Sequence, residues 1–80
     1  MKKIQIGDFI TFSWQHPHAD GVDTIYLHGT VTGTITSDTL RVEDIFNTAG
    51  LARYADELEL NVGSVIQAQK PVSLPLYKGG

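Results

Sequence analysis

The chain has 80 residues, a formal net charge of −3 and no cysteine. A chain of this length forms one domain with a small core. The lack of cysteine excludes a disulfide framework and thiolate metal sites. The mild negative charge argues against non-specific binding to nucleic acid, because that binding needs a basic surface to attract phosphates.

The amino-terminal sequence, MKKIQIGDF, has two lysines but neither the apolar segment nor the cleavage site of a signal peptide. No apolar run approaches the roughly 20 residues that a membrane-spanning helix needs. A cysteine-free composition is typical of reducing compartments. We therefore expect a cytoplasmic protein without a membrane partner.

Two stretches, residues 9–14 and 24–35, alternate between apolar and polar side chains and predict β-strands. Threonine and valine enrichment in the second stretch also favours a strand over a helix. The residues expected on the common inward face are Ile10, Phe12, Trp14, Ile25, Leu27, Gly29, Val31, Gly33 and Ile35.

The dipeptide Asp20-Gly21 predicts a two-residue turn between these strands, because a type I′ turn needs positive φ at both positions. This corner pairs His18 with Asp23 and Phe12 with Gly29, and it brings the inward faces of both strands together. Gly29 would then make room for the aromatic ring opposite it.

A second turn is expected at Ser37-Asp38, which pairs Thr34 with Arg41 and Thr32 with Glu43. Beyond it we predict a third strand over residues 39–46 and a turn at NTAG. The remaining expected elements are a short strand LARY, one tight helical turn at ADEL, a strand LELNV that continues into SVIQAQ, and an extended or flexible tail over 71–80.

An alternative is a helix within residues 44–58, since Ala, Leu, Arg and Glu favour helices. That helix would give an α+β, β-grasp-like fold. The terminal Gly79-Gly80 pair fits this alternative, because small carrier proteins of the β-grasp type end in Gly-Gly. A two-residue motif is a weak signal, however.

The motifs GDFITF and YADELEL resemble the first strand and the fourth-to-fifth strand connection of SH3-like small barrels. In those barrels the first strand often opens with Gly-Asp, and one 3₁₀ turn often joins the fourth strand to the fifth. The resemblance covers roughly residues 6–68. It implies an all-β fold, with a single five-stranded SH3-like barrel over residues 1–70 and a tail over 71–80.

The histidines of the first hairpin are candidate metal ligands. His16 and His18 share a strand face, and the predicted register places Asp23 opposite His18. Two imidazoles and a carboxylate can bind Zn²⁺ or Ni²⁺. A hairpin tip is a normal place for polar residues, though, and such a cross-strand pair contributes only about 0.2–1 kcal/mol. We therefore expect neither a metal nor a cofactor, and a pH response is better supported.

The outward face of the first two strands carries Phe9, Tyr26, His28 and Thr32. Outward aromatics predict a partner-binding surface, unless the tail or residues 44–55 cover them. Exposed edge strands offer a second route, through strand addition by a partner or by a second copy. The sequence therefore predicts a small interaction module that binds a protein partner or self-associates.

Catalysis is not expected, because the serines lie outside a G-x-S-x-G motif and no P-loop is present. The alternative partner is nucleic acid, which some SH3-like domains bind. Its phosphate contacts would come from Lys2, Lys3, Arg41 and Arg53.

Overall fold

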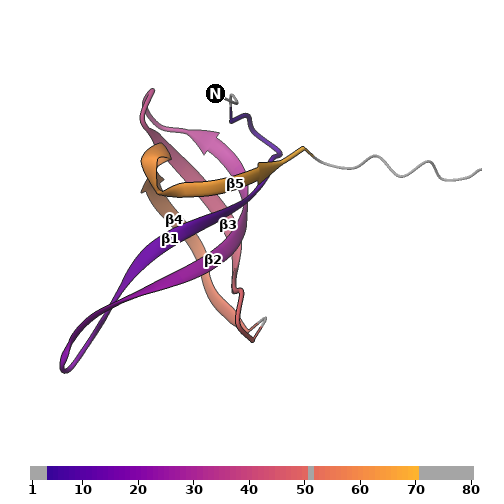
Figure 1. Ribbon diagram of the computed structural model, residues 1–80. Coiled ribbons are helices and arrows are strands. Elements are labelled where there is room, and N and C mark those ends of the chain that lie inside the picture. Colours follow the sequence, from indigo (N-terminus) through magenta and orange to yellow (C-terminus); the bar gives the residue numbers. More distant parts are fainter. Residues whose placement is uncertain (1–3, 51, 71–80) are drawn as a thin grey trace, which may run out of the picture.

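The computed structural model describes residues 4–50 and 52–70. Its elements are β1 (Phe9–His18), β2 (Gly21–Thr34), β3 (Thr39–Asn47), β4 (Arg53–Asn61), the 3₁₀ turn η1 (Val62–Ser64) and β5 (Val65–Gln69). The five strands form one antiparallel sheet in the order β4-β3-β2-β1-β5 (Figure 1). The prediction of a small all-β fold is confirmed.

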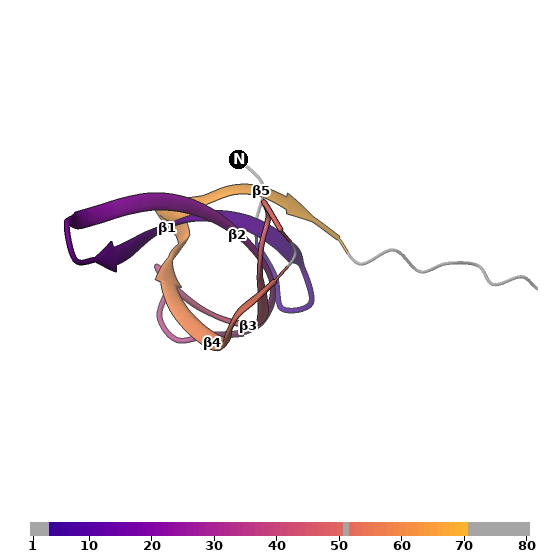
Figure 2. The same cartoon turned by 90° about the horizontal axis from the view of Figure 1, so that it is seen from below.

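The sheet curls strongly, as the view from below shows (Figure 2). Two register shifts between β2 and β3 contribute, one between His28 and Thr30 and one between Val31 and Gly33. At the first shift β3 has one residue more than β2, and Asp44 there has a φ of 56°. Bulges of this kind increase the local twist and bend a strand, so they help to wrap the sheet around its own inner face.

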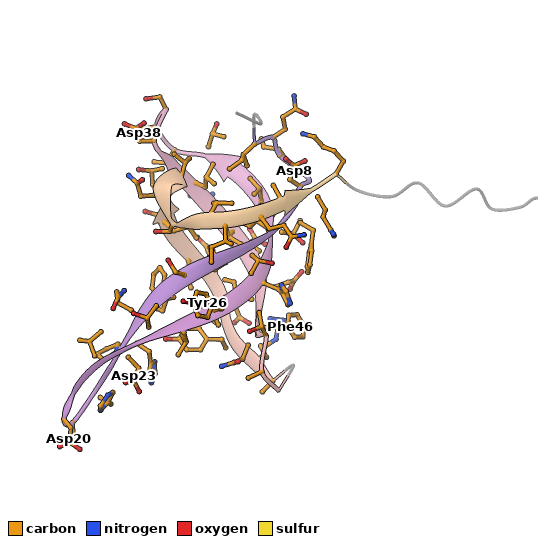
Figure 3. All side chains as sticks on the ribbon, viewed as in Figure 1. Asp8, Asp20, Asp23, Tyr26, Asp38 and Phe46 are labelled. Carbon is orange, nitrogen blue, oxygen red and sulfur yellow. The ribbon has the colours of Figure 1, made fainter. Side chains whose placement is uncertain are left out.

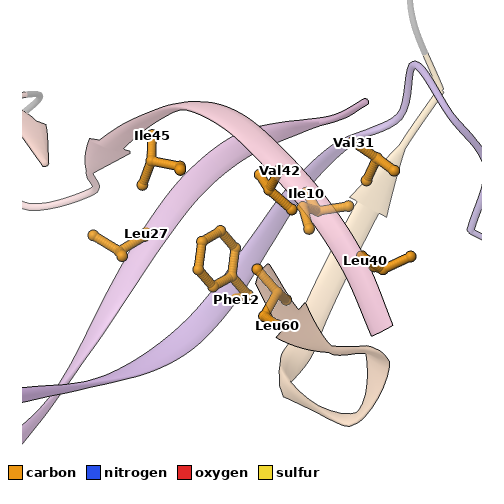
Figure 4. Packing of buried hydrophobic residues seen from close by; sticks show 8 residues of the cluster. All are labelled: Ile10, Phe12, Leu27, Val31, Leu40, Val42, Ile45 and Leu60. Atoms are coloured by element: carbon orange, nitrogen blue, oxygen red, sulfur yellow. The ribbon is translucent and has the colours of Figure 1, made fainter. Parts of the chain in front are cut away.

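The core lies inside this curl (Figure 4). Its buried members are Ile10, Phe12, Leu27, Val31, Leu40, Val42, Ile45 and Leu60. Trp14 and Ile25 pack against this cluster and are partly buried. The expectation for Ile35 is wrong, because β2 ends at Thr34 and the Ile35 side chain is 43% exposed in the following turn.

The first hairpin turns one residue earlier than predicted. His18 pairs with Gly21, so Ala19 and Asp20 form the corner, and Gly21 opens β2 with a φ of 141°. The register therefore shifts by two residues, and Phe12 pairs with Leu27. Because side chains alternate with a period of two, a shift of two residues keeps every predicted face.

Gly29 has a different packing reason from the predicted one. It pairs with Ile10, not with Phe12. A Cβ atom at this position would overlap Val42 Cγ1 and come within 3.2 Å of Ile45 Cγ1. Gly29 therefore makes room for the side chains of β3, and not for an aromatic ring of β1.

The predicted pairs of the second hairpin are also wrong by one position. Thr34 pairs with Leu40, because the turn is wider than the dipeptide predicted. The Ile35 N–H donates to the Thr39 carbonyl at 2.9 Å, which encloses residues 36–38 in the turn. Thr32 is not paired with Glu43, although its hydroxyl donates to the Glu43 carboxylate at 3.1 Å.

Residues 53–61 form one continuous strand, so both the helical turn at ADEL and the alternative helix within 44–58 are wrong. The tight turn lies at η1 instead. There Asn61 Oδ1 accepts a hydrogen bond from the Gly63 N–H at 2.7 Å. Leu58 and Leu60 pair with β3 and turn toward the core, which favours the strand over a helix. The described residues 44–50 and 52–58 therefore do not form the helix that a β-grasp fold requires. The Gly79-Gly80 pair lies outside the described residues.

A buried carboxylate ties the start of β1 to the end of β5. Asp8 is 1% exposed, and its Oδ2 accepts the Gln5 N–H at 2.9 Å and lies 3.2 Å from Lys70 Nζ. The turn that makes this possible has Gly7 at a φ of 99°, a left-handed conformation that glycine adopts without strain. The Gln5 N–H, aided by Lys70, lowers the pKa of Asp8 despite the opposing effect of burial.

Candidate interaction surface

A row of outward side chains crosses four strands of the sheet. His28 on β2 pairs with Thr11 on β1 and with Phe46 on β3, and Phe46 pairs with Arg53 on β4. Directly paired residues on one face of a sheet are in contact range. The row is therefore one continuous surface assembled from segments that are distant in the sequence.

Ring contacts hold this row in place. The Phe9 ring stacks on His28 with centroids 5.2 Å apart. The His28 Nδ1 is 3.0 Å from the Thr11 hydroxyl, which fixes the plane of the imidazole. At the other end, Arg53 Cζ lies 5.6 Å from the centroid of the Phe46 ring. A cation over an aromatic face is attracted by the ring quadrupole.

We define the aromatic surface as Phe9, Tyr26, His28 and Phe46. Figure 3 labels Tyr26 on β2 and Phe46 on the neighbouring β3. Phe9 is 40% exposed and Tyr26 is 48% exposed. Residues 44–47 and 53–55 lie in strands β3 and β4, and residues 48–50 form the turn after β3. This segment leaves Phe9 and Tyr26 exposed. The tail that could also have covered them lies outside the described residues.

The surface differs from the predicted set in two residues. Thr32 is not part of it, because Thr32 lies at the second register shift. The residue beside Phe9 on β2 is Thr30 instead. Phe46 was not predicted, because strict alternation from Val42 would point it inward. The bulge at Asp44 reverses the alternation, so that Ile45 is buried and Phe46 faces outward. No local sequence pattern marks this reversal.

The hairpin histidines have separate partners. His16 Nδ1 lies 2.9 Å from the Tyr54 hydroxyl, and the two rings meet edge to face at 5.7 Å. His18 Nε2 lies 3.3 Å from Asp23 Oδ1 near the exposed hairpin tip, where Figure 3 labels Asp23. In the described part of the chain, no group of three or more potential ligands could hold a metal ion.

The His16–Tyr54 contact crosses the inside of the curl, because β1 and β4 are not neighbours in the sheet. The phenol can donate to a neutral imidazole or accept from a charged one. The contact can therefore form in both protonation states of His16.

The described arginines of the alternative nucleic-acid site are paired with carboxylates. Arg41 Nε lies 3.3 Å from Glu57 Oε2. Arg53 contacts Asp44 and Asp56, each at 3.2 Å. Lys2 and Lys3 lie outside the described residues. Arg41 and Arg53 therefore lie in acidic surroundings, which weaken their attraction for phosphates.

A hollow lies along β5. Its volume is about 1030 Å³, and its apolar lining consists of Ile4, Ile35, Leu40, Val62, Val65 and Ile66, with Ala68 beside them. We call it the apolar groove. The sequence did not predict it, because it depends on the approach of the turn at 34–37 to β5. A space of this size can hold several side chains.

Comparison with family models, curated proteins and solved structures finds no match for this chain. Within residues 4–50 and 52–70, no helix has the length and apolar character required to cross a membrane.

Proposed function

We propose that the protein is a non-catalytic interaction module that binds a partner protein through the aromatic surface. One observation carries this proposal: Phe9, His28 and Phe46 form an outward row across β1, β2 and β3, with Arg53 over its end. Aromatic residues and arginine are enriched in protein interfaces and supply most of their binding energy.

The exposure and fixation of these rings support the same role. Tyr26 and Phe9 remain 48% and 40% exposed, so a partner can still remove apolar area from water. The stacking of Phe9 on His28 already restricts both rings. Restricting side chains before binding lowers the entropy cost of association.

We infer further that the sheet is of the SH3-like barrel type and that the protein works in the cytoplasm. The strand order β4-β3-β2-β1-β5 and the 3₁₀ turn between β4 and β5 support the first inference. The absence of cysteine from the sequence supports the second.

The Tyr26→Ala substitution tests the aromatic surface. A partner is first recovered from cells with the wild-type chain as bait, then purified and titrated by calorimetry. We expect Tyr26→Ala to weaken binding by about 2 kcal/mol or more, the cost of removing an interface anchor. The same titration of Phe9→Ala should show a loss in the same direction.

The Val22→Ala variant is the matched control, because Val22 is 58% exposed near the tip of the hairpin and outside the aromatic surface. It should bind like the wild-type chain. Equal binding by all variants, or failure of the wild-type bait to recover a partner, would contradict the proposal.

Salt dependence separates this proposal from nucleic-acid binding. Phosphate-driven affinity falls steeply as salt rises, because bound counterions are released. An aromatic protein contact should keep its affinity between about 50 and 200 mM salt to within a few fold, while phosphate contacts by several basic residues would lose far more.

A further inference from the structure

The two edge strands of the sheet differ in charge. β4 carries Asp56, Glu57 and Glu59, all exposed, and charged side chains are a usual protection of an edge against another strand. β5 carries no charged residue, and its Ile66 side chain is 59% exposed. β5 is therefore the edge at which a further strand can pair without charge repulsion.

The apolar groove runs beside this same edge. Four consecutive residues of β5, from Val65 to Ala68, line it together with Thr34 at the end of β2 and residues 35–37 of the following turn. A strand paired with β5 would place alternate side chains toward Leu40 and Val62 in the groove. The edge and the groove together fit an extended segment whose alternate residues are apolar.

Residues 71–77, PVSLPLY, have this pattern. Val72, Leu74 and Leu76 alternate with Pro71 and Pro75. In an extended chain, alternate residues share a face and direct their N–H groups to the same edge. The three apolar residues can therefore all donate to β5, while both prolines, which lack an N–H, fall on the outer edge where proline is tolerated.

Residues 71–77 cannot pair with β5 of their own chain, so the segment has to come from a second copy. Antiparallel pairing with the chain's own β5 would require reversal at Lys70-Pro71, whereas tight hairpin turns need positive φ and proline is fixed near −65°. Parallel pairing needs a crossover of a dozen or more residues, and only Lys70 separates β5 from residues 71–77.

We propose that residues 71–77 of a second copy of this chain pair with β5 and place Val72, Leu74 and Leu76 in the apolar groove. Reciprocal exchange closes the assembly as a dimer. This interface uses the free edge of β5 and the groove, whereas Tyr26, His28 and Phe46 of the aromatic surface lie on β2 and β3; only Phe9 is on β1, the neighbour of β5. Each proposal can therefore fail while the other stands.

Sedimentation equilibrium of the full chain, Leu74→Asp and Ser73→Asp tests this interface. Both substitutions add one carboxylate at adjacent positions, but only residue 74 faces the groove. The dimer dissociation constant should rise at least about tenfold for Leu74→Asp, because a carboxylate is costly to bury. It should change by less than about threefold for Ser73→Asp, as expected of an outward surface position.

Nuclear magnetic resonance of an equimolar mixture of ¹³C-labelled and unlabelled wild-type chains identifies the source of the segment without any substitution. We expect isotope-filtered contacts between the methyl groups of Leu74 or Leu76 and those of Ile66 in the other copy. Three results would overturn the proposal: contacts within one copy only, equal weakening by both substitutions, or a monomer at about 1 mM. Even weak specific association is populated at that concentration.

Discussion

At the scale of single residues, Gly29 lies where the side chains of β3 press on the backbone of β2. An alanine methyl would overlap Val42 Cγ1, and both residues are buried. Adding a methyl group to a well-packed core costs about 1–3 kcal/mol. We expect Gly29→Ala to lower the free energy of unfolding by this amount, measured by urea denaturation with Trp14 fluorescence as the probe.

The Gly33→Ala variant is the control for the same strand. A Cβ on Gly33 would meet Arg41 Cβ at 3.7 Å, an ordinary van der Waals distance. Its free energy of unfolding should stay within about 0.5 kcal/mol of the wild-type value. Equal destabilisation by the two alanines would show that strand propensity, and not the approach of β3, explains Gly29.

The ionisation of the Asp8 carboxyl group makes the stability of the fold depend on pH. Its pKa lies below the ordinary value of 3.8, chiefly because the Gln5 N–H stabilises the carboxylate. A carboxylate with a lowered folded-state pKa stabilises the fold above the unfolded-state pKa, and this contribution disappears as pH falls through the folded-state pKa. We expect Asp8→Asn to cost about 1–3 kcal/mol at pH 7, because it places an amide beside Lys70 in a buried site.

The pH dependence identifies the carboxylate itself as the cause. The stability difference between wild type and Asp8→Asn should be constant above about pH 5 and shrink as pH falls below 3.8. Thermal denaturation from pH 2 to 7 measures it, with the exposed Asp38→Asn as a control. A difference that is independent of pH would assign the loss to packing instead.

At the scale of elements, the β1–β2 hairpin extends beyond the curled sheet as an arm (Figure 1). The His16–Tyr54 hydrogen bond at 2.9 Å joins this arm to β4. Tyr54→Phe removes the hydroxyl and keeps the ring, and it should cost about 0.5–1.5 kcal/mol. We expect faster hydrogen exchange of arm amides in residues 15–24, measured by NMR, with little change in core amides.

His18→Ala serves as the comparison in the same arm. The His18–Asp23 pair is exposed, with side chains 37% and 68% accessible, so its loss should have an effect of about 0–1 kcal/mol. If His18→Ala accelerates exchange as much as Tyr54→Phe does, the contact across the curl is not what holds the arm.

At the scale of the whole molecule, the sequence predicts the face of the sheet on which a side chain lies better than it predicts the residue paired with it on the next strand. Alternation alone identified Ile10, Phe12, Leu27 and Val31 as inward, because a two-residue error in the turn leaves the faces unchanged. The register itself depends on corners and bulges. Asp44, with its positive φ, has no local pattern that separates it from any other polar strand residue.

The same limit applies to the surfaces. Phe9, Tyr26 and His28 were predicted to face outward because they lie on one regular strand pair. Phe46 and the apolar groove were not, because each depends on how distant segments meet after the sheet bends. The 3₁₀ turn was predicted, but at ADEL, since its cap at Asn61 is recognisable only once β4 is known to continue to that residue.

The pairing of Phe9 with Gln69 has a consequence for the order of events in folding. The hairpins from β1 to β4 join neighbours along the chain, whereas β5 must return to the far side of β1. Contacts between distant segments carry the larger loop-closure cost and form later. During synthesis, the outer edge of β1 therefore waits unpaired until residues 65–69 have been made. In that interval the nascent chain exposes an unpaired strand edge to other nascent chains that are being made on the same messenger RNA.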